Sequence, residues 1–250
     1  MNKPITSRDN PVIKHTARLV ADKALRRDEG LFVCEGAVML EEALRSGAKV
    51  RRVFFREGLE QDLPEGVEGY VVPQALLERI SDVKTPQGIL FTVESRDMTG
   101  PLTGSHLLCC ENLRDPGNMG TILRTAEALG MDGVVLVGDC VDPLAPKTVR
   151  SSMGSVFRLP VWRKSLAELR TELSGLGLPL WGAALHRDAK DARTVDFSKA
   201  AVLIGNEARG LSEEAIAACD GLTILPITGA ESLNASVAAA LFMWEMAKTN

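Results

Sequence analysis

Almost continuously apolar segments alternate with amphipathic segments through the second half of this 250-residue chain. DGVVLVG at 132–138 and AAVLIGNE at 200–207 are typical apolar segments. Strands that are apolar on both faces are buried on both faces, and the helices between them provide the cover. The pattern therefore predicts an α/β domain built on a mostly parallel sheet, with a long helix over 232–248 at the end.

The first part of the chain predicts a second, smaller α/β unit. Its expected strands are LFVCEG, VRRVFFRE, GYVVP and GILFTVE, and its expected helices are AVMLEEALRSGA and QALLERIS. The segment ESRDMTGPLTGS that follows is polar, contains glycine and proline, and lacks periodicity, which is typical of a linker. We predict an N-terminal domain over 1–95, a linker over 96–104 and a second domain over 105–250.

Composition excludes several classes of protein. The five cysteines form no C-x-x-C pair and the three histidines are widely spaced, so we expect no zinc or other metal site. Scattered cysteines suit a reducing cytoplasm. No apolar run approaches the roughly 20 residues of a membrane span, and the opening MNKPITSRDNPVIKH has no apolar signal core. We expect a cytoplasmic protein with no membrane segment.

The loop DPGNMGT at 115–121 lacks the spacing of a dinucleotide-binding loop and the lysine of a P-loop. Asn118 is a candidate cap for a helix expected over 121–130. That interpretation leaves Arg124 unexplained, because a cation early in a helix meets the positive end of the helix dipole. A bound phosphate or a nearby carboxylate would offset this cost.

Two further clusters follow predicted strands. In LIGNEARGLS at 203–212, glycines at the carboxyl end of a strand allow a ligand to approach the backbone, with Glu207 as a polar anchor; a tight turn with a solvated glutamate explains the pattern equally well. In LPITGAESLNASVAAALF at 225–242, Ser232 is a candidate helix cap. The apolar helix that follows, with Met243 and Trp244, is typical of a core or a dimer interface.

Taken together and in this order, D-P-G-N-x-G-x-I-x-R-T-A, L-I-G-N-E-x-x-G-L-S and L-P-I-x-G-x-x-S-L-N-x-S-V-A-A-A resemble the three motifs of the SpoU/TrmH family of RNA ribose 2′-O-methyltransferases, in the SPOUT superfamily. The resemblance covers roughly residues 105–248. S-R-D-N-P-x-I-K and F-V-C-E-G near the N-terminus resemble, more loosely, the substrate-binding domain that often precedes this catalytic domain.

The resemblance implies a parallel α/β sheet with a deep trefoil knot, preceded by a smaller α/β domain that binds RNA. It implies S-adenosylmethionine as cofactor, held by backbone groups of Gly205, Leu225 and Leu233 with Ile227 close by. The implied activity is methylation of a ribose 2′-hydroxyl in structured RNA. We favour 23S ribosomal RNA as substrate; transfer RNA, or an idle RNA-binding member of the same fold, are the alternatives.

The resemblance also assigns roles to polar residues. Arg124 would be either the general base or the group that stabilises the developing alkoxide and holds an adjacent phosphate. Asn118 and Glu207 would position the ribose and Arg124, while Ser232 and Asn234 would hold their loop and orient the arginine. The family acts as homodimers through the catalytic domain, and no metal is required.

The segment 1–27 carries seven basic and two acidic residues, which alone favours a solvated helix face over an RNA contact. With the family resemblance, we expect phosphate contacts from basic side chains in two regions: Lys14, Arg18, Arg26, Arg27, Lys147 and Arg150. A serine hydrolase is disfavoured, because the three histidines lie outside the motifs and no G-x-S-x-G is present.

Overall fold

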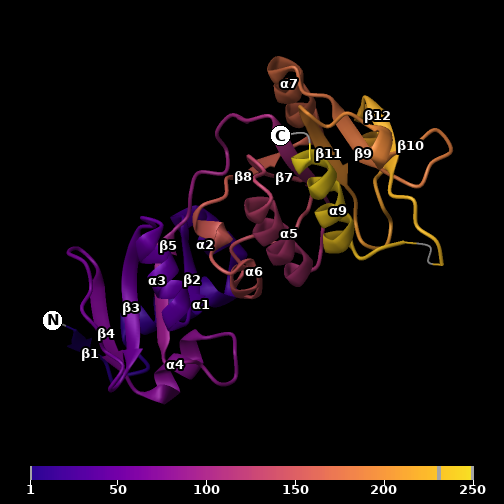
Figure 1. Cartoon of the computed structure of the whole chain (residues 1–250). Helices are drawn as coiled ribbons and strands as arrows, with labels where there is room; N and C mark the ends of the chain where they lie inside the picture. The colour runs from indigo at the N-terminus through magenta and orange to yellow at the C-terminus, as the bar shows by residue number, and fades with distance from the viewer. Residues whose placement is uncertain (1, 230–231, 249–250) are drawn as a thin grey trace. The chain divides into compact units, whose positions relative to one another are not determined.

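The computed structural model describes residues 2–229 and 232–248, which form two compact units (Figure 1). One unit contains the described residues up to Arg96 together with Asp142–Phe157, and the other contains Asp97–Val141 with the described residues from Arg158 onward. Residues 142–157 therefore group with the first unit, although the sequence analysis placed them after the linker.

The second unit contains, within the described residues, a seven-stranded sheet of order β10-β12-β9-β11-β6-β7-β8. The strands are β6 (His106–Glu111), β7 (Gly133–Val137), β8 (Val161–Lys164), β9 (Leu180–Ala183), β10 (Lys190–Asp191), β11 (Ala200–Ile204) and β12 (Gly221–Ile224). Every ladder between neighbouring strands is parallel. The predicted parallel α/β sheet is confirmed.

Helices cover both faces of this sheet. They are α5 (Pro116–Ala128), α7 (Leu166–Leu176), α8 (Glu213–Ala218) and α9 (Ala235–Ala247), with a short 3-10 helix at Ala192–Thr194. Side chains of α5 and α9 share one apolar core with Leu108 of β6, whereas side chains of α7 and α8 share another with Leu107. Successive strand residues point to opposite faces, so the buried β6 divides its side chains between two cores. In the described chain, no helix is both long and apolar enough to cross a membrane.

The first unit contains a five-stranded mixed sheet of order β1-β4-β3-β5-β2, as far as the structure describes it. Its strands are β1 (Lys3–Pro4), β2 (Leu31–Glu35), β3 (Val50–Arg56), β4 (Glu68–Val72) and β5 (Ile89–Glu94). Its helices are α1 (Pro11–Ala21), α2 (Lys23–Glu29), α3 (Ala37–Arg45), α4 (Gln74–Ile80) and α6 (Pro146–Ser152), with a 3-10 helix at Ser155–Phe157. β5 runs antiparallel to β2 and β3, and the other pairings are parallel.

The inserted segment 142–157 is held in the first unit by polar and aromatic contacts. Asp142 Oδ2 accepts hydrogen bonds from Arg26 Nε at 2.8 Å and forms an ion pair with Arg26 Nη2 at 2.7 Å. The rings of Phe32 and Phe157 stack with centroids 6.2 Å apart, and α6 packs against β2. A strand of the first sheet is thus covered by a helix that the sequence places between β7 and β8.

Two helix starts differ from the sequence-based expectation. Helix α5 begins at Pro116, and its cap is Asp115, whose Oδ1 accepts a hydrogen bond from Asn118 N at 2.7 Å. Proline suits a first helical position because its missing N–H is not needed there. Arg124 therefore lies about two turns inside the helix, where the dipole argument does not apply. Helix α9 is capped by Asn234, and not by Ser232.

Candidate functional site

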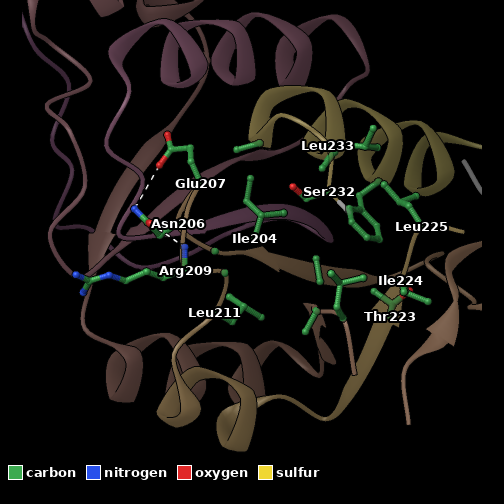
Figure 2. Close-up of a pocket in the computed structure, with 18 of the residues that line it drawn as sticks. Ile204, Asn206, Glu207, Arg209, Leu211, Thr223, Ile224, Leu225, Ser232 and Leu233 are labelled. Atoms are coloured by element: carbon green, nitrogen blue, oxygen red, sulfur yellow. Dashed lines mark hydrogen bonds between the residues drawn. The ribbon is translucent and has the colours of Figure 1, made fainter. Parts of the chain in front are cut away.

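A cavity of about 420 Å³ opens beyond the carboxyl ends of β9, β11 and β12 (Figure 2). This edge is where ligands bind in open parallel sheets, and the volume is in the range of small-molecule sites. Its wall is mainly apolar, with backbone from the loops after β11 and β12. The lining includes all four residues that the resemblance assigned to the cofactor: Gly205, Leu225, Ile227 and Leu233.

The loop after β11 folds back tightly on the end of its own strand. Asn206 N donates to Gly210 O at 3.0 Å, and Gly210 N donates to Asn206 O at 2.9 Å. A Cβ atom on Gly205 would lie 2.1 Å from the carbonyl carbon of Gly210. Only glycine fits at position 205, and its backbone is left facing the cavity.

Glu207 accepts four hydrogen bonds, three of which join this loop to the start of α5 and the residues just before it. Its Oε1 accepts from Asp115 N at 3.0 Å and from Asn118 Nδ2 at 3.1 Å. Its Oε2 accepts from Arg114 N at 3.2 Å and from Asn206 Nδ2 at 3.3 Å. Burial by itself raises the pKa of the Glu207 carboxyl, but the hydrogen bonds from backbone N–H groups and from Asn118 outweigh burial and lower that pKa. Glu207 is held as a carboxylate.

A second amide links the start of α5 to the start of α9. Asn234 Nδ2 donates to Asn118 Oδ1 at 3.0 Å. Asn234 Oδ1 accepts from Ser236 N at 2.9 Å and from the Ser236 hydroxyl at 2.7 Å. Glu207, Asn118 and Asn234 are thus consecutive members of one hydrogen-bonded chain. The structure brings together three loops that are far apart in the sequence.

Two predicted site residues stand outside this chain of hydrogen bonds. Ser232 lines the cavity beside Leu233 (Figure 2). Arg124 is exposed on α5, and among the described residues it has no hydrogen-bond or ion-pair partner. The structure therefore groups Glu207, Asn118 and Asn234, whereas the Arg124 guanidinium has no polar partner among the described residues.

Sequence reasoning missed two residues that shape the site. Asn112 has a φ of 52°, and its carbonyl accepts a hydrogen bond from Asn206 Nδ2 at 2.9 Å. Glu111 is 6% exposed and accepts from Ser212 N at 2.9 Å and from the Ser212 hydroxyl at 2.6 Å. Together they fix both ends of the loop after β11. The sequence signal that could have found these two residues is their polar character directly after the apolar segment HLLCC.

The basic residues predicted to contact RNA lie in different environments. Arg26 is 4% exposed, and besides Asp142 it donates to the carbonyls of Leu19 at 2.6 Å and Val20 at 2.9 Å. A guanidinium so enclosed holds the first unit together and is not available to a phosphate. The other five side chains are at least partly accessible, and three of them have a carboxylate partner: Lys14 with Asp9, Arg27 with Asp28 and Arg150 with Asp82.

Comparison with known proteins places these features in a family. The SpoU rRNA Methylase family model matches residues 105–244, and the MRM3-like substrate binding domain matches residues 10–90. The chain is 32% identical to 23S rRNA (guanosine(2553)-2′-O)-methyltransferase RlmP of Bacillus subtilis, over 98% of this chain and 99% of that protein.

Two crystal structures resemble the whole chain. The AdoMet-bound rRNA methyltransferase of Sinorhizobium meliloti has a TM-score of 0.88 at 31% identity, covering 98% of this chain and 97% of that one. The SpoU methyltransferase AviRb of Streptomyces viridochromogenes, in complex with AdoMet, has a TM-score of 0.83 at 27% identity, covering 96% and 97%. The similarity thus extends over both units.

Proposed function

The chain belongs to the SpoU rRNA methylase family, and from this premise we propose that it methylates a ribose 2′-hydroxyl of 23S ribosomal RNA with S-adenosylmethionine as donor. The observation that carries the proposal is the cavity at the carboxyl edge of the sheet, beside the hydrogen-bonded chain Glu207–Asn118–Asn234. The relatives that match this chain over both of its units are named as rRNA methyltransferases.

The cavity fits S-adenosylmethionine on two counts. Its apolar wall suits the adenine ring and the aliphatic part of the methionine. The second count is Gly205, which has no side chain between its backbone and the cavity; a Cβ at this position would collide with Gly210. Gly205, Leu225 and Leu233 would hold the cofactor through backbone groups, with Ile227 packing beside it. When bound, the cofactor supplies a methyl group on a positively charged sulfur.

The protein's part in the reaction is to align the ribose and stabilise the charge that forms on it. The ribose 2′-hydroxyl would supply the nucleophilic oxygen and lose its proton to solvent, and the bound cofactor would supply the methyl group. A guanidinium remains protonated in proteins, so we assign Arg124 to stabilising the developing alkoxide and holding the neighbouring phosphate. Asn118 and Glu207 keep the loops in register, and Ser232 and Asn234 fix the segment before α9.

We propose a homodimer formed through the catalytic unit. Helix α9 buries one apolar face, while Val237, Leu241 and Trp244 are 47%, 41% and 53% exposed. Their spacing of four and three residues puts them on one stripe, which makes the helix apolar on nearly all sides. Leu241→Lys or Trp244→Lys should shift the protein to the monomer mass in light scattering. Variants that stay dimeric would contradict this interface.

We propose three further features of this protein. We propose that the C-terminal segment threads through a loop to form the deep trefoil knot typical of the family, and that the protein works in the cytoplasm. We also propose that Arg18 and Lys147, which are exposed without an ion-pair partner in the described chain, contact RNA phosphates in the first unit. Such contacts position the RNA without reading its sequence.

The test of function is methyl transfer to defined RNA. Large-subunit ribosomal RNA transcribed in vitro should accept labelled methyl groups on a ribose 2′-oxygen, and the same mark should be missing from ribosomal RNA of cells that lack the protein. A lost mark in transfer RNA would favour the transfer RNA alternative. If every 2′-O-methyl mark survived the deletion, the proposal would be wrong. Calorimetry with S-adenosylmethionine separates an active enzyme from an idle RNA-binding member that has lost its cofactor.

A further inference from the structure

Arg209 lies near the tip of the loop between β11 and α8, at the rim of the cavity. Its side chain is exposed, and no described residue forms an ion pair or hydrogen bond with its guanidinium. We propose that Arg209 binds a phosphate of the RNA strand next to the target ribose. The inference rests on the proposed function and adds a substrate contact to it.

The loop that carries Arg209 is fixed before any RNA arrives. Asn206 Oδ1 accepts hydrogen bonds from Ala208 N at 3.0 Å and from Arg209 N at 3.2 Å. The paired backbone groups of Asn206 and Gly210 close the loop, and Gly210 has a φ of 67°. Binding therefore has to order only the arginine side chain and not the backbone, which reduces its entropic cost.

The direction of the side chain separates Arg209 from the cofactor. Figure 2 shows its guanidinium extending away from Ile204, Ser232 and Leu225, which surround the cavity. Arg209 is one of the residues that line the cavity, while its guanidinium extends away from it. An exposed guanidinium outside the cavity is suited to a ligand bound to the surface, and the RNA is the anionic component of this reaction. A planar guanidinium can bind a phosphate through two hydrogen bonds.

Among the described residues, no carboxylate competes for Arg209. The Glu207 carboxylate accepts its hydrogen bonds from Arg114 N, Asp115 N, Asn118 and Asn206. The guanidinium of Arg114 forms an ion pair with Asp139, at 2.6 Å between Nη1 and Oδ2. A phosphate that reached Arg150 would have to compete with Asp82, whereas Arg209 has no carboxylate partner in the part of the chain that the structure describes.

The test compares two charge-removing variants at opposite ends of the same strand. Lys199 is exposed just before the amino end of β11, so Lys199→Gln removes one positive charge from the far edge of the sheet. The affinity of wild type, Arg209→Gln, Arg209→Lys and Lys199→Gln for large-subunit ribosomal RNA is measured by filter binding at several salt concentrations. S-adenosylmethionine affinity is measured by calorimetry, and thermal unfolding checks the fold.

We expect Arg209→Gln to weaken RNA binding roughly tenfold and to lower the slope of log affinity against log salt by about one. S-adenosylmethionine affinity and the unfolding temperature should not change. Arg209→Lys should restore the slope, and Lys199→Gln should behave as wild type. A wild-type slope in Arg209→Gln, or an equal loss in Lys199→Gln, would overturn the inference. These measurements need no turnover, so they are independent of whether the wild type methylates this RNA.

Discussion

At the scale of single residues, the site is built on a carboxylate that acts only as an acceptor. Both oxygens of Glu207 are engaged by N–H groups from the loop before α5, from Asn118 and from Asn206. Those donors lower the pKa of Glu207 despite its partial burial. A base that takes up a proton near neutral pH needs the opposite shift, so we propose that Glu207 holds the loops and is not the group that takes the ribose proton.

The lowered pKa of Glu207 makes its contribution to stability depend on pH. Because the folded pKa lies below the unfolded one, the stabilisation is fully present above the unfolded value and is lost as pH falls through the folded value. Glu207→Gln should therefore lower the unfolding temperature at neutral pH, and its difference from wild type should shrink as pH drops below about 4. Thermal unfolding across this range, with the exposed Glu214→Gln as control, checks the prediction. A difference independent of pH would contradict it.

Arg124 should be indispensable for methyl transfer and dispensable for folding. It is exposed and forms no hydrogen bond or ion pair with a described residue, so Arg124→Ala should keep the wild-type unfolding temperature and S-adenosylmethionine affinity. Loss of a group that stabilises transition-state charge typically costs on the order of a hundredfold in rate or more. Arg124→Lys should recover part of this. Single-turnover methyl transfer measures both, and near-wild-type transfer by the alanine variant would remove Arg124 from the reaction.

The types of residue in the site could be predicted from the three motifs, but not their mutual contacts. Nothing in the spacing of Asn118 and Asn234 shows that their amides meet, because 116 positions separate them. Arg26 was interpreted as an RNA contact because the segment around it is basic. Its burial depends on Asp142, far along the chain. The catalytic and RNA-binding assignments stay predictions until the variants are measured.

At the scale of elements, Asn234 caps α9 and also bridges to α5, and two substitutions separate these roles. Asn234→Ala removes both, and should cost about 1 kcal/mol for the cap alone. Asn234→Asp keeps the oxygen that accepts from Ser236 but replaces the donor that faces Asn118 Oδ1. We expect the aspartate variant to unfold near the wild-type temperature and to bind S-adenosylmethionine more weakly. Wild-type cofactor affinity in the aspartate variant would show that only the cap matters.

Helix boundaries were predicted less well than helix identity, for a local reason. The apolar periodicity of the motif begins near Ile122, whereas α5 starts at Pro116 because Asp115 caps it and proline fits its first turn. Its first five residues include two glycines, which propensity scales disfavour in helices. Serine and asparagine are comparable as helix caps, so residue type alone does not distinguish Ser232 from Asn234. The observed cap, Asn234, also forms a hydrogen bond with Asn118. Neither boundary could be derived from local pattern alone.

At the scale of the whole molecule, the apolar strands predicted the parallel sheet. The sequence did not predict which segments make up the first unit. Helix α6 spans Pro146–Ser152. Its place against β2, in a unit otherwise built from the first 96 residues, has no signal in composition or periodicity. The buried pair Arg26–Asp142 shows why the segment belongs there, since each charge needs the other once water is excluded.

That pairing predicts that one substitution has a large effect in the whole chain and a small effect in a fragment. In the full-length protein, Arg26→Met removes the cation that faces the buried Asp142, which should destabilise the first unit by about 3–5 kcal/mol. A fragment of residues 1–96 lacks Asp142 and the rest of the segment that encloses Arg26, so water reaches the guanidinium, and there Arg26→Met should change stability by about 0.5 kcal/mol or less. Urea unfolding followed by circular dichroism compares the four proteins. An equally large loss in the fragment would mean that Asp142 contributes nothing to holding Arg26.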